Sequence, residues 1–107
     1  MIEKYLPRTD FDSYEDFKEN YRLNVPDNFN FAYDIVDGWA KQDDKKLALV
    51  WCDDEGHRKD YTFCDISRLS NKAANYLSSL GIGVGDRVMM ILKQRPEVWI
   101  TISALCK

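Results

Sequence analysis

Apolar residues recur every three or four positions in three stretches of the chain, the spacing that places them on one face of an α-helix. This spacing predicts helices over residues 13–22, 30–41 and 63–80. The third pattern is the most regular, and polar residues occupy the other faces of that helix. Its apolar positions are Phe63, Ile66, Leu69, Ala73, Leu77 and Leu80.

Two continuous apolar runs predict β-strands that are covered on both faces. They are "LALVWC" at residues 47–52 and "RVMMIL" at residues 87–92. After the first run, "DDEG" predicts a tight turn in which Gly56 can adopt a positive φ. The weaker alternation of "HRKDYTF" indicates a returning, more exposed strand, so the two strands are expected to form a hairpin.

Residues typical of helix ends flank the predicted helices. Ser13 and Thr62 each stand three residues before an aspartate, so each can cap the N-terminus of a helix. Gly81 follows the third helix, where a left-handed C-terminal cap is expected. Pro96 suits the first position of a fourth helix in the apolar stretch that follows it. The predicted fold class is therefore α/β, with helices, a β-hairpin and then a β-strand–helix unit.

The length of 107 residues fits one small domain or a piece of a larger one. The fourth helix is apolar around most of its circumference, which indicates that it is buried in a larger body. The 15 basic and 18 acidic residues are interleaved and give a net charge of −3. This charge distribution argues against a nucleic-acid partner and favours no anionic membrane surface.

The sequence predicts a soluble, cytoplasmic protein. Its first residues contain no apolar core long enough for a signal peptide, and no stretch approaches the roughly 18 apolar residues of a membrane span. Cys52, Cys64 and Cys106 are odd in number and far apart, so they are interpreted as small buried hydrophobes in a reducing compartment. His57 is the only histidine, which excludes a multi-histidine metal site.

The stretch "GIGVGD", which contains Gly81, Gly83 and Gly85, raises the question of phosphate binding. A dinucleotide fingerprint has the spacing G-x-G-x-x-G and lies between a strand and the helix that the strand leads into. Here the helix precedes the loop, so the glycines meet the negative end of the helix dipole, and Asp86 adds a further negative charge. We therefore interpret the stretch as a helix cap and a turn.

Other candidate sites have simpler structural interpretations. Lys93 and Arg95 precede the fourth helix and could bind an anion, but solvated surface cations are the favoured interpretation. The acidic run 53–55 could suggest calcium, but it lacks the EF-hand pattern and is typical of a hairpin tip. His57 could act as a general base, but no nucleophile is in view, and we expect an exposed side chain.

The chain has three tryptophans, which are Trp39, Trp51 and Trp99. They could stack on a base or ring, but each lies in an apolar stretch, so core packing is expected. No G-x-S-x-G, H-E-x-x-H or P-loop pattern occurs. The sequence therefore assigns no catalytic, cofactor-binding or metal-binding residue.

The order of features resembles the start of an AMP-forming acyl-CoA synthetase of the adenylate-forming superfamily. The most specific parts are the T-F-x-D-I-x-x-x-S-N-K-x-A-N helix and the L-G-I-x-x-G-D-R-V turn. The likeness covers residues 28–107 and extends more loosely to the N-terminal arm. It is strongest to the medium-chain acyl-CoA synthetase branch. In the family both parts are scaffold.

The resemblance implies a two-step ligase reaction in the parent protein. A fatty acid carboxylate attacks the α-phosphate of ATP, and the thiol of coenzyme A then displaces AMP from the acyl-adenylate. ATP, Mg²⁺ and coenzyme A are the implied cofactors. The family's Ser/Thr/Gly-rich phosphate loop, aromatic-Gly-x-Thr-Glu motif, ribose-binding aspartate and mobile-domain lysine have no counterpart here.

We therefore expect an N-terminal fragment that is inactive alone. Residues 1–29 are expected to form an arm with a short helix, and residues 30–107 the truncated start of the AMP-binding domain. The implied partners are the remainder of the polypeptide and, in the parent, the small-molecule substrates. The alternative is a free-standing α/β interaction module that binds a partner through its apolar C-terminal helix.

Overall fold

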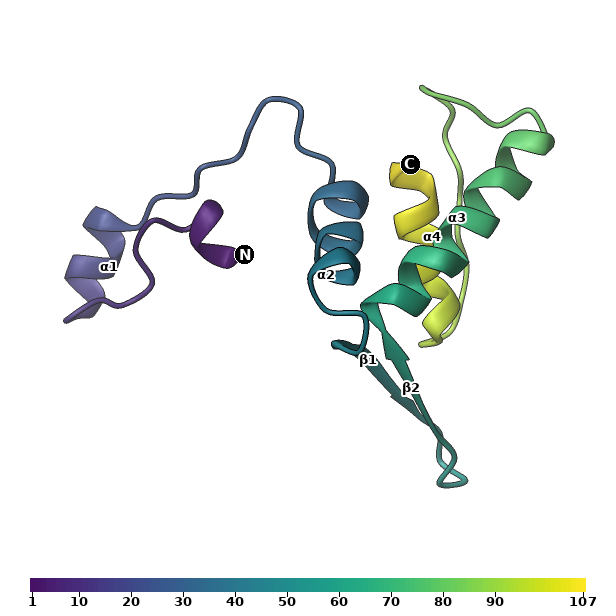
Figure 1. Ribbon diagram of the computed structural model, residues 1–107, viewed down its shortest axis with the longest axis horizontal. Helices are drawn as coiled ribbons and strands as arrows, with labels where there is room; N and C mark the ends of the chain where they lie inside the picture. The colour runs from purple at the N-terminus through teal and green to yellow at the C-terminus, as the bar shows by residue number, and fades with distance from the viewer.

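The computed structural model describes residues 1–107, with the exception of the side chain of Ile2. The described residues form four α-helices and one two-stranded antiparallel sheet, so the mixed α/β composition is confirmed (Figure 1). None of these helices has the length and apolar character needed to cross a membrane. The elements are η1 (Ile2–Lys4), α1 (Tyr14–Asn20), η2 (Ala32–Val36), α2 (Asp37–Gln42), β1 (Leu47–Cys52), β2 (Arg58–Thr62), α3 (Phe63–Ser79) and α4 (Pro96–Cys106).

The N-terminal arm lies to one side of the remaining elements and joins them through an extended segment, and its Met1 side chain lies close to Gly38 of α2 (Figure 1). Its helix α1 begins where predicted, because the backbone N–H of Asp16 donates to Ser13 Oγ at 3.1 Å. The Arg8 guanidinium holds both carboxylate oxygens of Asp16, at 2.8 and 2.6 Å. No residue of α1 is buried, so local caps and ion pairs hold this helix.

The predicted hairpin and the helix after it are confirmed. Strand β1 pairs with β2, and Gly56 in the turn has a φ of 86°. Helix α3 begins with a capping box, in which Thr62 Oγ1 accepts from the backbone N–H of Asp65 and the Asp65 carboxylate accepts from that of Thr62. The hydrogen bond from the Thr62 N–H lowers the pKa of Asp65, so the cap stays ionised to a lower pH than a free aspartate would.

The small core lies where η2, β2 and α3 meet. Its buried members are Val36, Tyr61 and Ile66, with partly buried residues from β1, α3 and α4 around them. The predicted helix over residues 30–41 is present as η2 followed directly by α2, and its first part is a π-helix.

Helices α3 and α4 pack against each other, and three of their buried residues are small. Ser70 on α3 is fully buried, whereas Leu80, expected on the apolar stripe, is exposed. On α4, Ser103 and Ala104 are buried, and Pro96 occupies the first turn as predicted. Small residues allow two helix axes to approach closely. A sequence pattern of large apolar residues does not reveal a helix contact of this kind.

The prediction of a strand at residues 87–92 is wrong for this chain. The segment has no regular structure, and Met89 and Ile91 are 85% and 86% exposed. A buried strand needs hydrogen-bonded neighbours and two covering layers, and the only described sheet is the β1–β2 hairpin. For the same reason β1 is not covered on both faces, and its Leu47 and Val50 side chains are exposed.

The prediction of buried cysteines is also wrong. Cys52, Cys64 and Cys106 are all exposed, and all three are free thiols. Their positions explain the result, because they lie at the end of β1, in the first turn of α3 and in the last turn of α4, outside the small core.

Candidate functional site

The glycine-rich loop after α3 is a helix cap followed by a turn, as predicted. The Gly81 N–H donates to the Ser78 carbonyl at 3.0 Å and the Ile82 N–H to the Leu77 carbonyl at 3.2 Å. This pair of bonds is a Schellman motif, and Gly81 supplies the positive φ of 85° that it needs.

The loop also satisfies two further backbone N–H groups of its own, those of Gly83 and Asp86. The Gly83 N–H donates to a carboxylate oxygen of Asp86 at 2.8 Å, and the Asp86 N–H donates to the Gly83 carbonyl at 3.1 Å. A phosphate would have to displace a carboxylate that already holds this N–H group, and that carboxylate would also repel it. The geometry therefore supports a turn.

Replacing Gly85 with alanine should cost roughly 1 kcal/mol or more of folding stability, because an alanine at a positive φ is strained. The φ of Gly85 is 92°, and a Cβ there would meet nothing within 4 Å, so the loss would come from the backbone alone. Gly83→Ala is the matched control, since its Cβ also has open space and its φ is not positive. Urea unfolding of both variants measures the difference. A large loss of ATP binding in a well-folded Gly85→Ala full-length enzyme would instead support the hypothesis that this loop binds phosphate.

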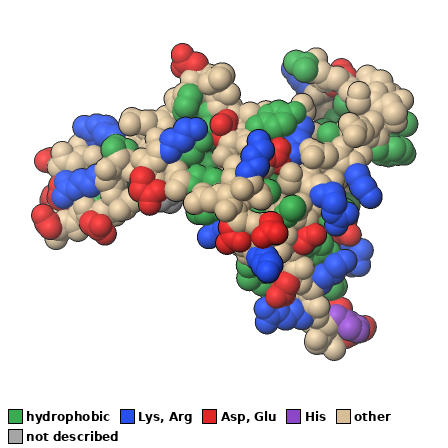
Figure 2. All heavy atoms as spheres, viewed as in Figure 1, with side chains coloured by type: hydrophobic (Ala, Val, Ile, Leu, Met, Phe, Trp, Pro, Cys, Tyr) green, Lys and Arg blue, Asp and Glu red, His purple; other side chains and the backbone are tan. Residues whose placement is uncertain are grey.

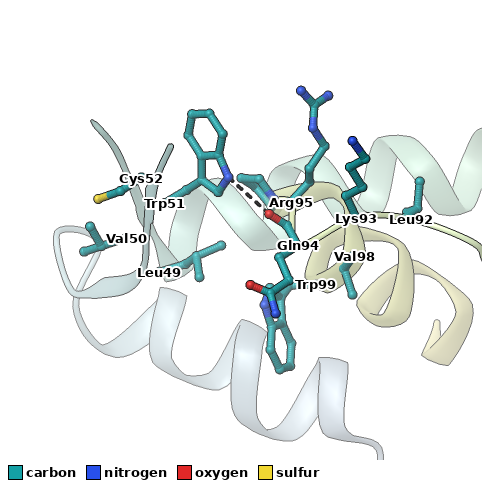
Figure 3. Close-up of a pocket in the computed structure, with 11 residues that line it drawn as sticks. Leu49, Val50, Trp51, Cys52, Leu92, Lys93, Gln94, Arg95, Val98 and Trp99 are labelled. Atoms are coloured by element: carbon teal, nitrogen blue, oxygen red, sulfur yellow. Dashed lines mark hydrogen bonds between the residues drawn. The ribbon is translucent and has the colours of Figure 1, made fainter. Parts of the chain in front are cut away.

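A cleft of about 540 Å³ lies between β1 and the loop that leads into α4. We call it the junction cleft. The Trp51 indole N–H donates to the Gln94 carbonyl at 3.3 Å and ties the strand to this loop (Figure 3). Lys93 and Arg95 extend to one side of the loop and Trp99 to the other (Figure 3). Both cations are exposed, in agreement with their interpretation as surface groups.

The expectation that all three tryptophans pack in a core holds only in part. Trp39 is half-buried and packs on Phe63, with ring centroids 6.1 Å apart. Trp51 is half-buried in the wall of the junction cleft. Trp99, in contrast, is 54% exposed and lines the junction cleft.

The tip of the hairpin brings three potential ligand groups together. His57 Nδ1 lies 2.8 Å from Asp53 Oδ2 and 3.8 Å from Glu55 Oε2. The hydrogen bond with the His57 ring lowers the pKa of Asp53, and two backbone N–H groups add to this effect. His57 is exposed, as predicted, and its recorded side-chain partners are carboxylates, so the described contacts give it no nucleophile to activate.

A buried ion pair at the end of α4 was not anticipated. Lys107 Nζ donates to both carboxylate oxygens of Asp37, at 2.8 and 3.0 Å, and to the Asn71 side-chain oxygen at 2.6 Å. Nearby, the Asn30 side-chain amide donates to the Cys106 carbonyl. These contacts join α4 to α2, to α3 and to the residues before η2. No local sequence pattern predicts the ion pair, because Asp37 and Lys107 are 70 residues apart.

The hydrogen bonds and ion pairs stabilise turns, helix ends and the junctions between helices. The open junction cleft has two exposed cations on its rim. The assignment of no catalytic, cofactor-binding or metal-binding residue stays a prediction.

Comparison with known proteins places the chain in a family. Residues 36–107 match the AMP-binding enzyme family. The chain is similar to mouse acyl-coenzyme A synthetase ACSM3, mitochondrial, with 36% identity over 96 residues, which is 84% of this chain and 17% of that protein. It is also similar to human acyl-coenzyme A synthetase ACSM4, mitochondrial, with 37% identity over 99 residues, which is 85% of this chain and 17% of that protein.

Rat acyl-coenzyme A synthetase ACSM5, mitochondrial, shares 37% identity over 86 residues, which is 75% of this chain and 15% of that protein. The chain thus spans about a sixth of the length of these relatives. The likeness covers the capped helix α3 and the turn after it, the two parts that carried the resemblance in the sequence. The family match therefore confirms that resemblance, and the chain belongs to the AMP-binding enzyme family.

Proposed function

We propose that this chain is the N-terminal scaffold part of an ATP-dependent acyl-CoA synthetase that adenylates a fatty acid and transfers the acyl group to coenzyme A. The observation that carries the proposal is the family match over residues 36–107, together with relatives that are named acyl-coenzyme A synthetases. Residues 1–29 are the arm of the parent protein, and residues 30–107 begin its AMP-binding domain. The cytoplasmic location stays a prediction, whereas the names of the relatives include "mitochondrial".

The exposed apolar surfaces support a scaffold that packs against further chain. Residues 88–92 are apolar but pair with no strand, and the Leu47 and Val50 side chains of β1 are exposed. Further strands and helices would satisfy both groups by pairing with the backbone and burying the side chains. In the parent, such segments would bind ATP, Mg²⁺, coenzyme A and the fatty acid.

The pure chain should show no fatty-acid-dependent exchange of pyrophosphate into ATP and should form no acyl-CoA. The physical reason is that adenylation needs groups that hold the phosphates and stabilise the developing charge, and the chain has no recognisable phosphate loop. A protein that carries this segment and has the full length of the relatives should be active in the same assay. Exchange by the pure chain above the level of a heat-denatured sample would overturn the proposal.

A second candidate, a free-standing interaction module, is favoured by the exposed apolar side chains of α4. Trp99, Ile102 and Leu105 are exposed on this helix and could bind a partner. Sequencing the gene beyond the codon for Lys107 separates the two candidates. Continuation into a Ser/Thr/Gly-rich loop supports the synthetase, and a stop codon supports the module.

A further inference from the structure

The end of the β-hairpin carries a group of three ligand atoms that the proposed function does not use. We call Asp53, Glu55 and His57 the tip cluster. One carboxylate oxygen from each acid and one ring nitrogen of the histidine lie within 4.8 Å of one another. The hairpin projects from the body of the molecule, and the histidine lies at its free end beside acidic side chains (Figures 1 and 2).

The separations lie around those of ligands that share one small cation. With zinc–nitrogen and zinc–oxygen bonds of about 2.0–2.2 Å, neighbouring tetrahedral ligands lie roughly 3.3–3.5 Å apart. His57 Nδ1 is 2.8 Å from Asp53 Oδ2 and 3.8 Å from Glu55 Oε2, on either side of this spacing. Side-chain rotations that move Glu55 inward and His57 away from Asp53 would place all three atoms around one ion.

The turn already fixes part of the arrangement. Asp53 Oδ1 accepts the backbone N–H groups of Glu55 and His57, at 3.1 and 2.8 Å, so the other oxygen faces the ring. The positive φ of Gly56 lets the chain reverse between the ligands. The Glu55 side chain is 82% exposed and free to move inward, because no neighbour encloses it.

No lysine or arginine forms an ion pair with the tip cluster among the described residues. The guanidinium of the adjacent Arg58 donates instead to the two carboxylate oxygens of Asp60, with nitrogen–oxygen distances of 2.7 and 2.9 Å. The histidine alone faces two carboxylates, and Asp54 adds further negative charge to the turn. A divalent cation would balance this charge better than one imidazole does.

We propose that the tip cluster binds one Zn²⁺ ion through His57 Nδ1, Asp53 Oδ2 and a carboxylate oxygen of Glu55, with water completing the coordination. Imidazole favours Zn²⁺ over Mg²⁺ and Ca²⁺, which prefer oxygen ligands. The ion links both ends of the turn, so binding stiffens the hairpin and takes no part in the ligase reaction.

The site is tested by titrating the whole chain with zinc chloride while the nuclear magnetic resonance signals of the His57 imidazole are recorded. His57 is the only histidine, so its ring signals report on the site without assignment. They should shift and saturate at one Zn²⁺ per chain, and an excess of Mg²⁺ should leave them in place. Zinc chloride that leaves the ring signals unmoved would overturn the proposal.

Variants separate coordination from general attraction to negative charge. In zinc titrations followed by calorimetry, which does not depend on the histidine signals, Glu55→Gln and His57→Gln should each weaken binding by about tenfold or more, because each removes a ligand. Glu55→Gln is the decisive variant, since no recorded hydrogen bond of the turn uses the Glu55 side chain. Asp54→Asn is the matched control and should change the affinity by less than about threefold, because a single exposed charge contributes little. An equal loss in Asp54→Asn and Glu55→Gln would refute the site.

The three exposed thiols could also take up Zn²⁺, so a chain with serine at these positions serves as a second background. The His57 signals should respond to zinc equally in both backgrounds. A response that disappears with the thiols would assign the metal to cysteine and overturn the proposal. The replaced residues are Cys52, Cys64 and Cys106.

Discussion

Replacing Asp37 with alanine is expected to lower the free energy of unfolding by about 3–5 kcal/mol, because it leaves a charged lysine buried without its counter-ion. The Lys107 side chain is only 3% exposed and that of Asp37 15%, so water cannot take over the lost interaction. Asn71 would remain as a neutral partner and could reduce the loss. Urea unfolding followed by circular dichroism measures the effect.

The double variant Asp37→Ala with Lys107→Met provides the control for this ion pair. Removing both charges removes the cost of burying an unpaired ion, so the double variant should be more stable than Asp37→Ala alone. Asp44→Ala, in the exposed turn after α2, controls for the loss of an acidic residue and should be nearly neutral. If Asp37→Ala and Asp44→Ala had equal effects, the Lys107 contact would contribute nothing to folding.

The isolated chain is expected to bind a hydrophobic dye and to self-associate. Its exposed apolar segment, residues 88–92, includes Met89 and Ile91 at 85% and 86% exposure. Large apolar patches on a monomer attract other apolar surfaces, because burial of the patch releases the water around it. Dye fluorescence and sedimentation velocity over a range of chain concentrations measure the two effects.

Lysines at two positions of this segment should abolish the association. Met89→Lys with Ile91→Lys breaks the apolar segment, and the chain should then sediment as a monomer with little dye binding. Val84→Lys is the matched control, since Val84 is equally apolar and fully exposed but lies in the glycine-rich loop. A wild-type monomer that melts cooperatively and binds no dye would contradict the expectation and favour the free-standing module.

Some functional conclusions followed from the sequence alone, because they depend on residues that are close together in the chain. The order of helix, glycine-rich loop and apolar run was enough to reject a phosphate loop, and the bond from the Gly83 N–H to Asp86 supports that conclusion. The proposed tip cluster did not emerge from the sequence, because the run 53–55 was compared only with a calcium loop. The spacing Asp-x-Glu-x-His on a tight turn was the available signal.

The sequence by itself determined the elements whose causes lie within a few residues. Ser13 and Thr62 begin their helices, Gly81 ends one, and Gly56 turns the hairpin, because each acts on backbone groups next to it in the chain. The resemblance to the family depends on these same local parts, since α3 and its following turn carry the specific motifs.

Only the tertiary structure decided the features that depend on distant partners. The segment 87–92 has strand-like residues but no neighbouring strand, so it stays irregular and exposed. Ser70 is buried because α4 packs against α3, and the three cysteines are exposed because the core is too small to reach them. Lys107 meets Asp37 only when the helices assemble. Packing and ion pairing act through space, and a linear pattern does not specify which distant surfaces will meet.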